Sequence, residues 1–343
     1  MILLCNSINY FVNSNSSKGY VSLMDSNFAD LDKVVRFNGY PSVVMLDIIS
    51  NICFQARDMG YQTELIHNCL DNSLEGVIVR EVGVGIINFP LYSNQVYNIE
   101  SLLTNAGLKQ TKACLQTAWS HFAEALKIHD KWEKIYISNM DFDAANRLAE
   151  DTIEDIFKQK ESKERGTVYH RYFGAATING SFDYIENLTS QIGTRYLIKG
   201  RPGTGKSTFL KKVAEHALNL GFNTEVYHCA FDPSSIDMVI VREMDMCLFD
   251  STSPHEYYPS RPNDKVIDIY KTAVKEKTDE KYRAEITSVM TEYKSAVAKA
   301  TKQLGRAKKY YDEVQRVLLT KIDAQELENI ESEISNYIFE ENK

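Results

Sequence analysis

The second half of this 343-residue chain repeats its first half, and this duplication constrains the fold more than any other feature of the sequence. At an offset of 161 residues, two pairs of segments match: residues 60–67 (GYQTELIH) with 221–228 (GFNTEVYH), and, after a one-residue slip, residues 77–81 with 239–243 (both VIVRE). Further along, at an offset of 182 residues, Asp130 falls opposite Asp312. Self-similarity over so long a period indicates one structural unit present twice.

Each copy has the alternation of short apolar runs and longer helical patterns that is typical of an α/β unit. In the first copy we expect strands at residues 34–37, 62–66 and 82–89, and helices at residues 45–59, 102–137 and 141–157. The second copy is expected to open with a strand at residues 169–177 and a helix at residues 181–192. We place the first domain at residues 1–157, a charged linker at 158–166, and the second domain at 167–343.

The second copy contains a glycine-rich loop with the pattern G-x-x-x-x-G-K-[ST], between a strand at residues 195–198 and a helix at 209–220. Glycines let successive backbone N–H groups turn toward phosphate oxygens, and the following helix adds partial positive charge. In this arrangement Lys206 reaches the phosphates and Ser207 holds Mg²⁺. The candidate nucleotide-binding residues are Gly200, Pro202, Gly203, Thr204, Gly205, Lys206, Ser207 and Thr208. The alternative is a strand–helix turn with an incidental lysine.

The first copy has lost these groups. Opposite residues 203–207 (GTGKS) stand residues 42–46 (SVVML), and Asn88 stands opposite Asp250. We therefore expect the first half to keep the fold without the nucleotide; the alternative is that it binds one by another route.

Asp250 ends an apolar strand at residues 246–249, where a carboxylate is placed to hold Mg²⁺ through its water shell. The polar residues 251–262 follow, and their counterpart in the first half is not comparably polar. His255 or Glu256 is a candidate to activate water or a hydroxyl, and Arg261 to stabilise phosphate charge. The alternative is a surface loop whose polarity is incidental.

His228, Cys229 and Asp232 follow the neighbouring strand, so we expect them near the same sheet edge. His228 and Asp232 are candidates to contact the ligand indirectly or to bind an acceptor, although an Asp-Pro turn explains Asp232 equally well. For His228 and Cys229 a structural role is favoured.

Residues 264–340 are expected to form a C-terminal helical hairpin, because an apolar seam persists there over about five heptads. Its many Ala and Tyr residues favour packing within the protein or against the other half. An intermolecular coil or a partner-binding arm, and hence a homo-oligomer, are the alternatives.

The formal net charge of −8 argues against a nucleic-acid-binding surface. Six cysteines without a C-x-x-C pair suit free thiols in a reducing compartment, and no apolar run approaches a membrane span, so we expect a cytoplasmic protein.

The chain resembles an uncharacterised bacterial family of predicted ATPases with tandem P-loop domains. The resemblance is strongest in residues 199–210, in 225–229 with Asp232-Pro233, and in 249–252 continuing through 255–257. It implies two P-loop NTPase-like domains with mainly parallel sheets, each followed by a helical segment, and it implies ATP as ligand with Mg²⁺ as cofactor. Family members tend to have a usable loop in the first domain as well, from which residues 42–46 depart.

The leading hypothesis is an ATP-hydrolysing, Mg²⁺-dependent enzyme with one site, in which Lys206, Asp250, Glu256, His255 and Arg261 are catalytic candidates. Two alternatives remain: a phosphotransferase acting on a small molecule or nucleotide, and a non-catalytic protein whose interactions are gated by nucleotide. The physiological partner is not identified by any motif.

Overall fold

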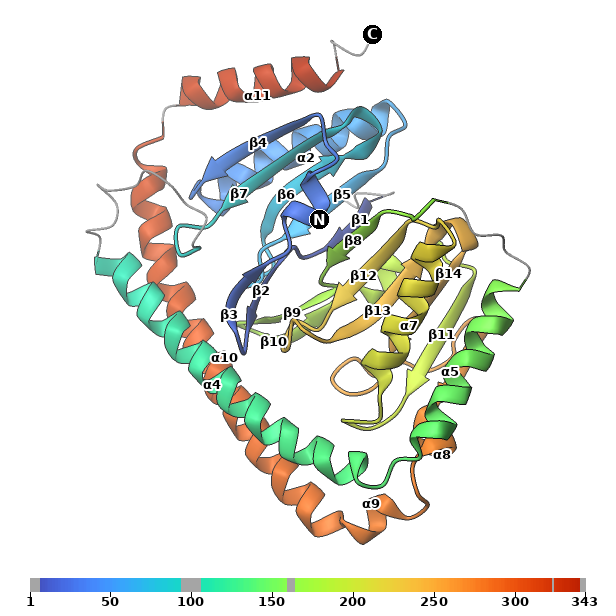
Figure 1. Ribbon diagram of the computed structural model, residues 1–343. Helices are drawn as coiled ribbons and strands as arrows, with labels where there is room; N and C mark the ends of the chain where they lie inside the picture. The colour runs from blue at the N-terminus through green and yellow to red at the C-terminus, as the bar shows by residue number, and fades with distance from the viewer. Residues whose placement is uncertain (1–6, 94–105, 159–163, 323, 340–343) are drawn as a thin grey trace.

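The fold is a mixed α/β structure built around two large β-sheets (Figure 1). The computed structural model describes residues 7–93, 106–158, 164–322 and 324–339. The strands of the first sheet are β1 (Ser7–Tyr10), β4 (Lys33–Asn38), β5 (Thr63–His67), β6 (Leu74–Val79) and β7 (Val84–Phe89). Those of the second are β8 (Val168–Arg171), β11 (Thr194–Lys199), β12 (Thr224–His228), β13 (Ile236–Val241), β14 (Met246–Asp250) and β15 (Asp264–Asp268).

The two sheets have the same topology. The first has the strand order β1-β5-β6-β7-β4, and the second has β8-β12-β13-β14-β11-β15. Each strand of the first sheet thus takes the same place as its counterpart in the repeat, and β15 is added at one edge of the second sheet.

Most strands in each sheet point the same way, as expected, but β6 and β13 run against their neighbours. The reason is the short connection before each of them, residues 68–73 and 229–235. A parallel return needs a crossover of a dozen or more residues, whereas a short loop returns the chain antiparallel.

One long helix in each half packs on its own sheet. These are α2 (Ser42–Asp58) and α7 (Lys206–Asn219), whose buried faces join the sheet residues in two separate hydrophobic clusters. The apolar residues of α7 recur at helical spacing, so one stripe faces the sheet and the rest is polar.

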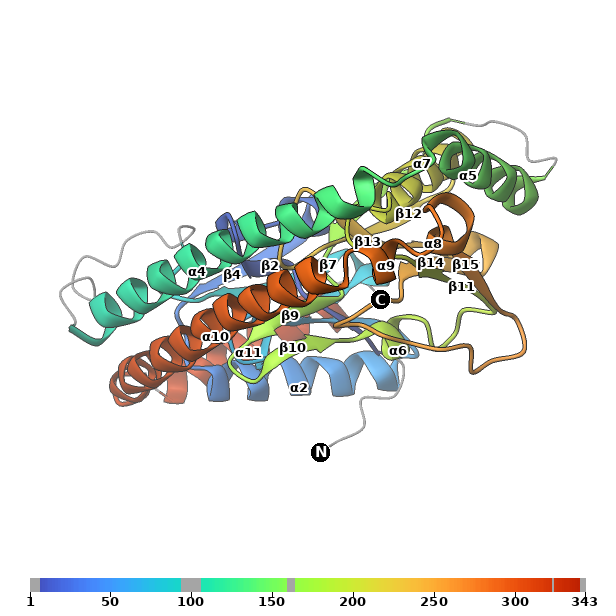
Figure 2. The ribbon, with the colours of Figure 1, turned by 90° about the horizontal axis from the view of Figure 1, so that it is seen from below.

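The remaining long helices cross between the halves. Helix α4 (Ala106–Ile137) follows the first sheet and pairs along its length with α10 (Arg283–Leu319), which follows the second (Figures 1 and 2). The pair is antiparallel, because Thr111 near one end of α4 contacts Ala307, while Ile128 near the other end packs with Ala296. The seam predicted in α10 therefore packs against the other half.

The two C-terminal helices of the repeats are also exchanged. Helix α5 (Phe142–Phe157) follows the first sheet but packs on α7 and α8 (Ile269–Ala273) of the second. Helix α11 (Ala324–Phe339) packs on α2 of the first sheet, with Ile334 buried in that core. The domain boundary expected at residue 157 thus divides the two sequence repeats. It does not divide the packing, because each half packs a helix on the sheet of the other half.

The helical hairpin expected over residues 264–340 is wrong in two respects. Residues 264–268 form the edge strand β15, and α10 takes α4 rather than α11 as its partner. Helical spacing shows that a seam is buried, but it does not identify the opposing surface.

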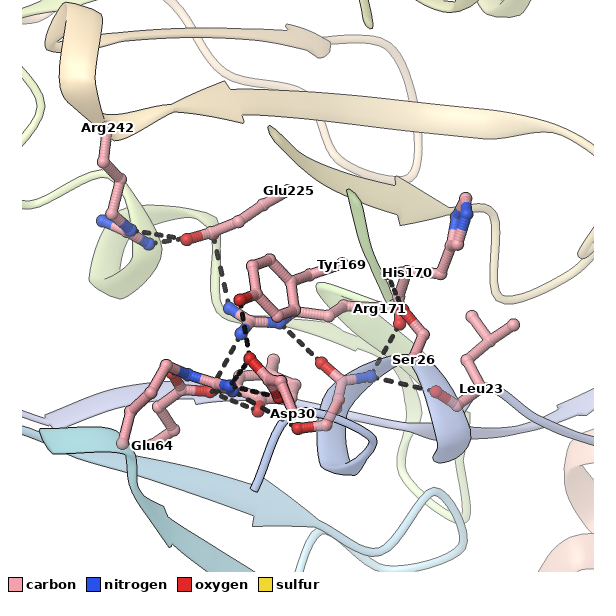
Figure 3. A network of polar contacts seen from close by, with 12 residues as sticks. Leu23, Ser26, Asp30, Glu64, Tyr169, His170, Arg171, Glu225 and Arg242 are labelled. Carbon is pink, nitrogen blue, oxygen red and sulfur yellow. Dashed lines mark hydrogen bonds and ion pairs between the residues drawn. The ribbon is translucent and has the colours of Figure 1, made fainter. Parts of the chain in front are cut away.

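The halves meet at equivalent positions of the repeat. Phe11 and Tyr172, which are 161 residues apart, exchange two backbone hydrogen bonds of 2.9 and 2.8 Å. Beside them lies Arg171, whose side chain is only 2 % exposed. Its guanidinium lies 2.9 Å from Glu64 in the first sheet and 3.5 Å from Glu225 in the second (Figure 3). One buried cation therefore joins carboxylates from both halves.

Two expected elements differ from the structure. Residues 169–177 are split between β8 and β9 (Gly174–Thr177), and the helix expected at residues 181–192 is wrong, because that segment opens with strand residues and its only helix is the short α6 (Ile185–Leu188). The missed signal is the Asn179-Gly180 turn, a strong hairpin dipeptide that joins β9 to β10 (Gly180–Asp183). In the first half β2 (Asn13–Ser16) and β3 (Gly19–Ser22) form the same hairpin, followed by α1 (Asp25–Phe28).

Several other expectations can be compared with the structure only in part. Residues 102–105 of the expected helix and most of the linker at 158–166 lie outside the described residues. Among the described cysteines, Cys53, Cys69, Cys114, Cys229 and Cys247 are free, as their spacing predicts, and Cys5 lies outside. Within the described part of the chain, no helix combines the length and apolar character needed to cross a bilayer.

Candidate nucleotide site

The glycine-rich loop joins the carboxyl end of β11 to the start of α7. Gly203 and Gly205 have φ angles of 77° and 84°, in the left-handed region that favours glycine. Thr204 is buried and closes the loop, accepting the Arg201 N–H at 3.2 Å and donating to the Arg201 carbonyl at 2.8 Å. Helix α7 begins at Lys206, so its free N–H groups face the loop.

Lys206 and Asp250 come together at this edge. Strands β11 and β14 are parallel neighbours, with Ile198 in register with Asp250. The Lys206 Nζ lies 3.5 Å from Asp250 Oδ2 and donates to the Arg201 carbonyl at 3.0 Å. The other Asp250 oxygen accepts the Thr252 N–H and hydroxyl, which fixes the carboxylate. A lysine and a carboxylate far apart in sequence thus flank the loop.

Ser207, the second candidate ligand for Mg²⁺, lies in the first turn of α7. Its Oγ accepts the Ile236 N–H at 3.0 Å, which orients the hydroxyl and leaves one lone pair. Hydroxyl and carboxylate oxygens are among the ligands that Mg²⁺ prefers, and both residues lie beside the glycine-rich loop. The donor set therefore fits this ion.

Asp237 is a further acidic residue of this site that the sequence analysis missed. It lies on β13, next to β14, and burial with repulsion from Asp250 raises its pKa to about 6. A hydrogen bond with Cys229 and attraction by His255 and Lys206 limit the rise of the Asp237 pKa. The repeat carried the signal, because Glu75 occupies the equivalent place in the first half.

His228, Cys229 and Asp232 have local structural partners. The His228 ring contacts the Pro233 carbonyl at 2.7 Å and His170 at 2.9 Å, and burial lowers its pKa. Asp232 accepts the Ser234 hydroxyl at 2.7 Å in the expected Asp-Pro turn and lies 3.4 Å from Lys18 of the first half. Burial raises the pKa of the Cys229 thiol, so it is not a reactive thiolate.

The loop at residues 251–262 leads away from the edge of the sheet at which the glycine-rich loop lies. Because β15 is parallel to β11, with Asp264 beside Arg195, the loop must return to the amino end of the sheet. There Arg261 pairs with Glu186 at 2.7 Å, so its expected position beside the phosphates is wrong. Glu256 is exposed and accepts the Tyr258 hydroxyl, and His255 pairs with Asp183 at 2.7 Å. His255 keeps an electrostatic interaction with Asp237.

The equivalent place in the first half is a small pocket with no lysine among its lining residues, although Lys308 of α10 pairs with the lining residue Asp71 at 3.4 Å. Its lining includes Ser42, Asn68, Asp71, Glu75, Asn88 and Gln315. Met45, opposite Lys206, is fully buried in the core. Burial raises the pKa of Glu75 to about 8, although Asn13 and Asn68 donate hydrogen bonds to it. Lys206, Ser207 and Asp250 of the second half are thus replaced in the first half by the apolar Met45 and Leu46 and the neutral Asn88.

Comparisons of the chain with protein-family models, with curated proteins and with solved structures gave no match. The functional interpretation therefore rests on the geometry of the loop, Lys206, Ser207 and Asp250.

Proposed function

We propose that the chain is an ATP-binding, Mg²⁺-dependent P-loop NTPase whose one site lies in the second half. The observation that carries this proposal is the approach of Lys206 Nζ to within 3.5 Å of Asp250, beside a loop of left-handed glycines at a helix start. The loop amides and Lys206 would bind the phosphates, and Ser207 and Asp250 would hold Mg²⁺, which supplies charge neutralisation for phosphoryl transfer. The first half then acts as a degenerate domain that interlocks with the active one.

The two other candidate functions have less support. A phosphotransferase needs an acceptor pocket, and the residues that would build it, His228 and Asp232, are engaged in a histidine pair and a turn. An arm for partner proteins needs a free apolar seam, and the seam of α10 is buried against α4.

Phosphate release from ATP in the presence of Mg²⁺ tests this proposal. Wild type is expected to turn over, and Lys206→Ala and Asp250→Asn are each expected to lose at least about 100-fold in kcat. Lys211→Ala is the matched control, since Lys211 lies on the same helix and its Nζ bonds to the Ser234 carbonyl. Equal rates in wild type and both site variants would contradict the proposal.

A further inference from the structure

The end of α4, a helix of the first half, lies against the phosphate loop of the second half. A Cβ atom added to Gly203 would come within 2.7 Å of the Glu133 carbonyl oxygen and 2.9 Å of its Cβ. The contact is reinforced one turn later, where the Tyr136 hydroxyl bonds to Asp279 at 2.8 Å and Asp279 pairs with Arg201 of the loop. The first half therefore forms one wall of the candidate site.

The Glu133 side chain brings a negative charge to this wall. Its carboxylate is attracted by Lys206 of the loop. Burial and repulsion from Asp130 raise its pKa, and the loop contacts oppose this rise. His129 lies 3.6 Å from the same carboxylate. A carboxylate beside the loop and its lysine competes with a phosphate for the same positive charge.

The degenerate half provides an internal comparison. The repeat sets Gln315 of α10 opposite Glu133, and Gln315 contacts Ser42, the counterpart of Gly203, at 3.3 Å. Each long helix thus reaches into the other half at the same place. The helix carries a carboxylate where the loop has its lysine, and a neutral amide where the loop has lost it. The negative charge at position 133 therefore occurs together with the loop that keeps its lysine.

We infer that Glu133, supplied by the first half, is an affinity-determining residue of the nucleotide site, whose negative charge weakens the binding of phosphate groups to the loop. This inference rests on the proposed function. Like charges a few ångströms apart repel strongly at a partly buried site, so the carboxylate opposes a phosphate bound at the loop.

Equilibrium binding of ATP and of inorganic pyrophosphate to Glu133→Gln and to wild type tests the inference. This substitution removes the charge and keeps the size of the side chain, so it is expected to raise the affinity for both ligands by about tenfold or more. Pyrophosphate lacks the base and sugar, so its tightening assigns the effect to the phosphates. Glu124→Gln is the matched control, because Glu124 is half-exposed on the same helix and pairs with His121 at 3.5 Å; its affinity should equal that of wild type.

The outcomes separate the two claims. Unchanged or weaker binding by Glu133→Gln, with or without lost turnover, would overturn the role of Glu133 and leave the site in place. No binding of either ligand by either protein would overturn the nucleotide site itself and the inference with it.

Discussion

Replacing Arg171 by Met should destabilise the protein by about 3 kcal/mol, because it leaves buried carboxylates without their shared cation. Arg171 is 2 % exposed and contacts Glu64 and Glu225 from opposite halves. Loss of one partner of a buried ion pair destabilises by about 3–5 kcal/mol. The lower value applies here, because Glu64 keeps Arg80 at 2.7 Å and Glu225 keeps Arg242 at 2.6 Å.

Urea unfolding at pH 7, followed by tryptophan fluorescence, measures this change. Both tryptophans, Trp119 and Trp132, lie on α4 between the halves. Arg165→Met is the control, since Arg165 and Glu215 form a largely exposed pair and its loss should leave the midpoint nearly unchanged. A difference below about 1 kcal/mol between Arg171→Met and wild type would refute the claim that this cation holds the halves together.

The pH dependence supplies a second check on the same residue. Burial alone would raise the pKa of Glu64, but Arg171, Arg80 and Tyr10 outweigh burial and hold the pKa at about 2. A carboxyl group whose pKa is lowered by folding stabilises the folded state at pH values above its ordinary pKa of about 4.5. This stabilisation is lost as the pH falls toward 2. The stability difference between wild type and Arg171→Met should therefore shrink between about pH 5 and pH 2.

Three further predictions concern the two sites and the helix pair. Burial raises the pKa of Glu75 to about 8, so the buried carboxyl destabilises the fold increasingly as the pH rises from 4.5 to 8. In urea unfolding, the free energy of unfolding of Glu75→Gln should therefore rise relative to that of wild type by on the order of 1–3 kcal/mol between pH 5 and 8. A difference that does not change with pH would contradict this prediction. Asp237→Asn should weaken Mg²⁺-dependent ATP binding by about 10- to 100-fold and leave Mg²⁺-free binding unchanged, and calorimetry showing equal losses in both would exclude a metal role. Ala300 is fully buried between α10 and α4, so Ala300→Leu should lower the unfolding free energy by about 1–3 kcal/mol, whereas exposed Lys299→Leu should not; equal effects would mean that the seam is loosely packed.

The positions of most strands and helices could be predicted because local pattern determines them. The strand before Gly200, helix α7 and the buried strand β7 follow from apolar periodicity and turn residues. The glycine-rich motif predicted the position of Lys206 between a strand and a helix. The repeat predicted that the two halves share one topology. These signals are local or internal to the chain, and packing does not override them.

Long-range packing could not be predicted from these patterns. The seam of α10 indicated burial, but only the structure identifies α4 as its partner. Arg171 stands opposite Tyr10 in the repeat, and nothing local indicates that it binds two carboxylates from different sheets. Arg261 was misplaced because the direction of β15, which draws its loop to the far edge, depends on pairing with β11.

Isothermal titration of the wild-type protein with Mg·ATP, beside Lys206→Ala, tests the central claim most directly. We predict one bound nucleotide per chain for wild type and an affinity at least about 100-fold lower for Lys206→Ala, because the lysine charge and the loop amides act together on the phosphates. No binding by wild type, a stoichiometry of two, or unchanged affinity in Lys206→Ala would contradict a single nucleotide site in the second half.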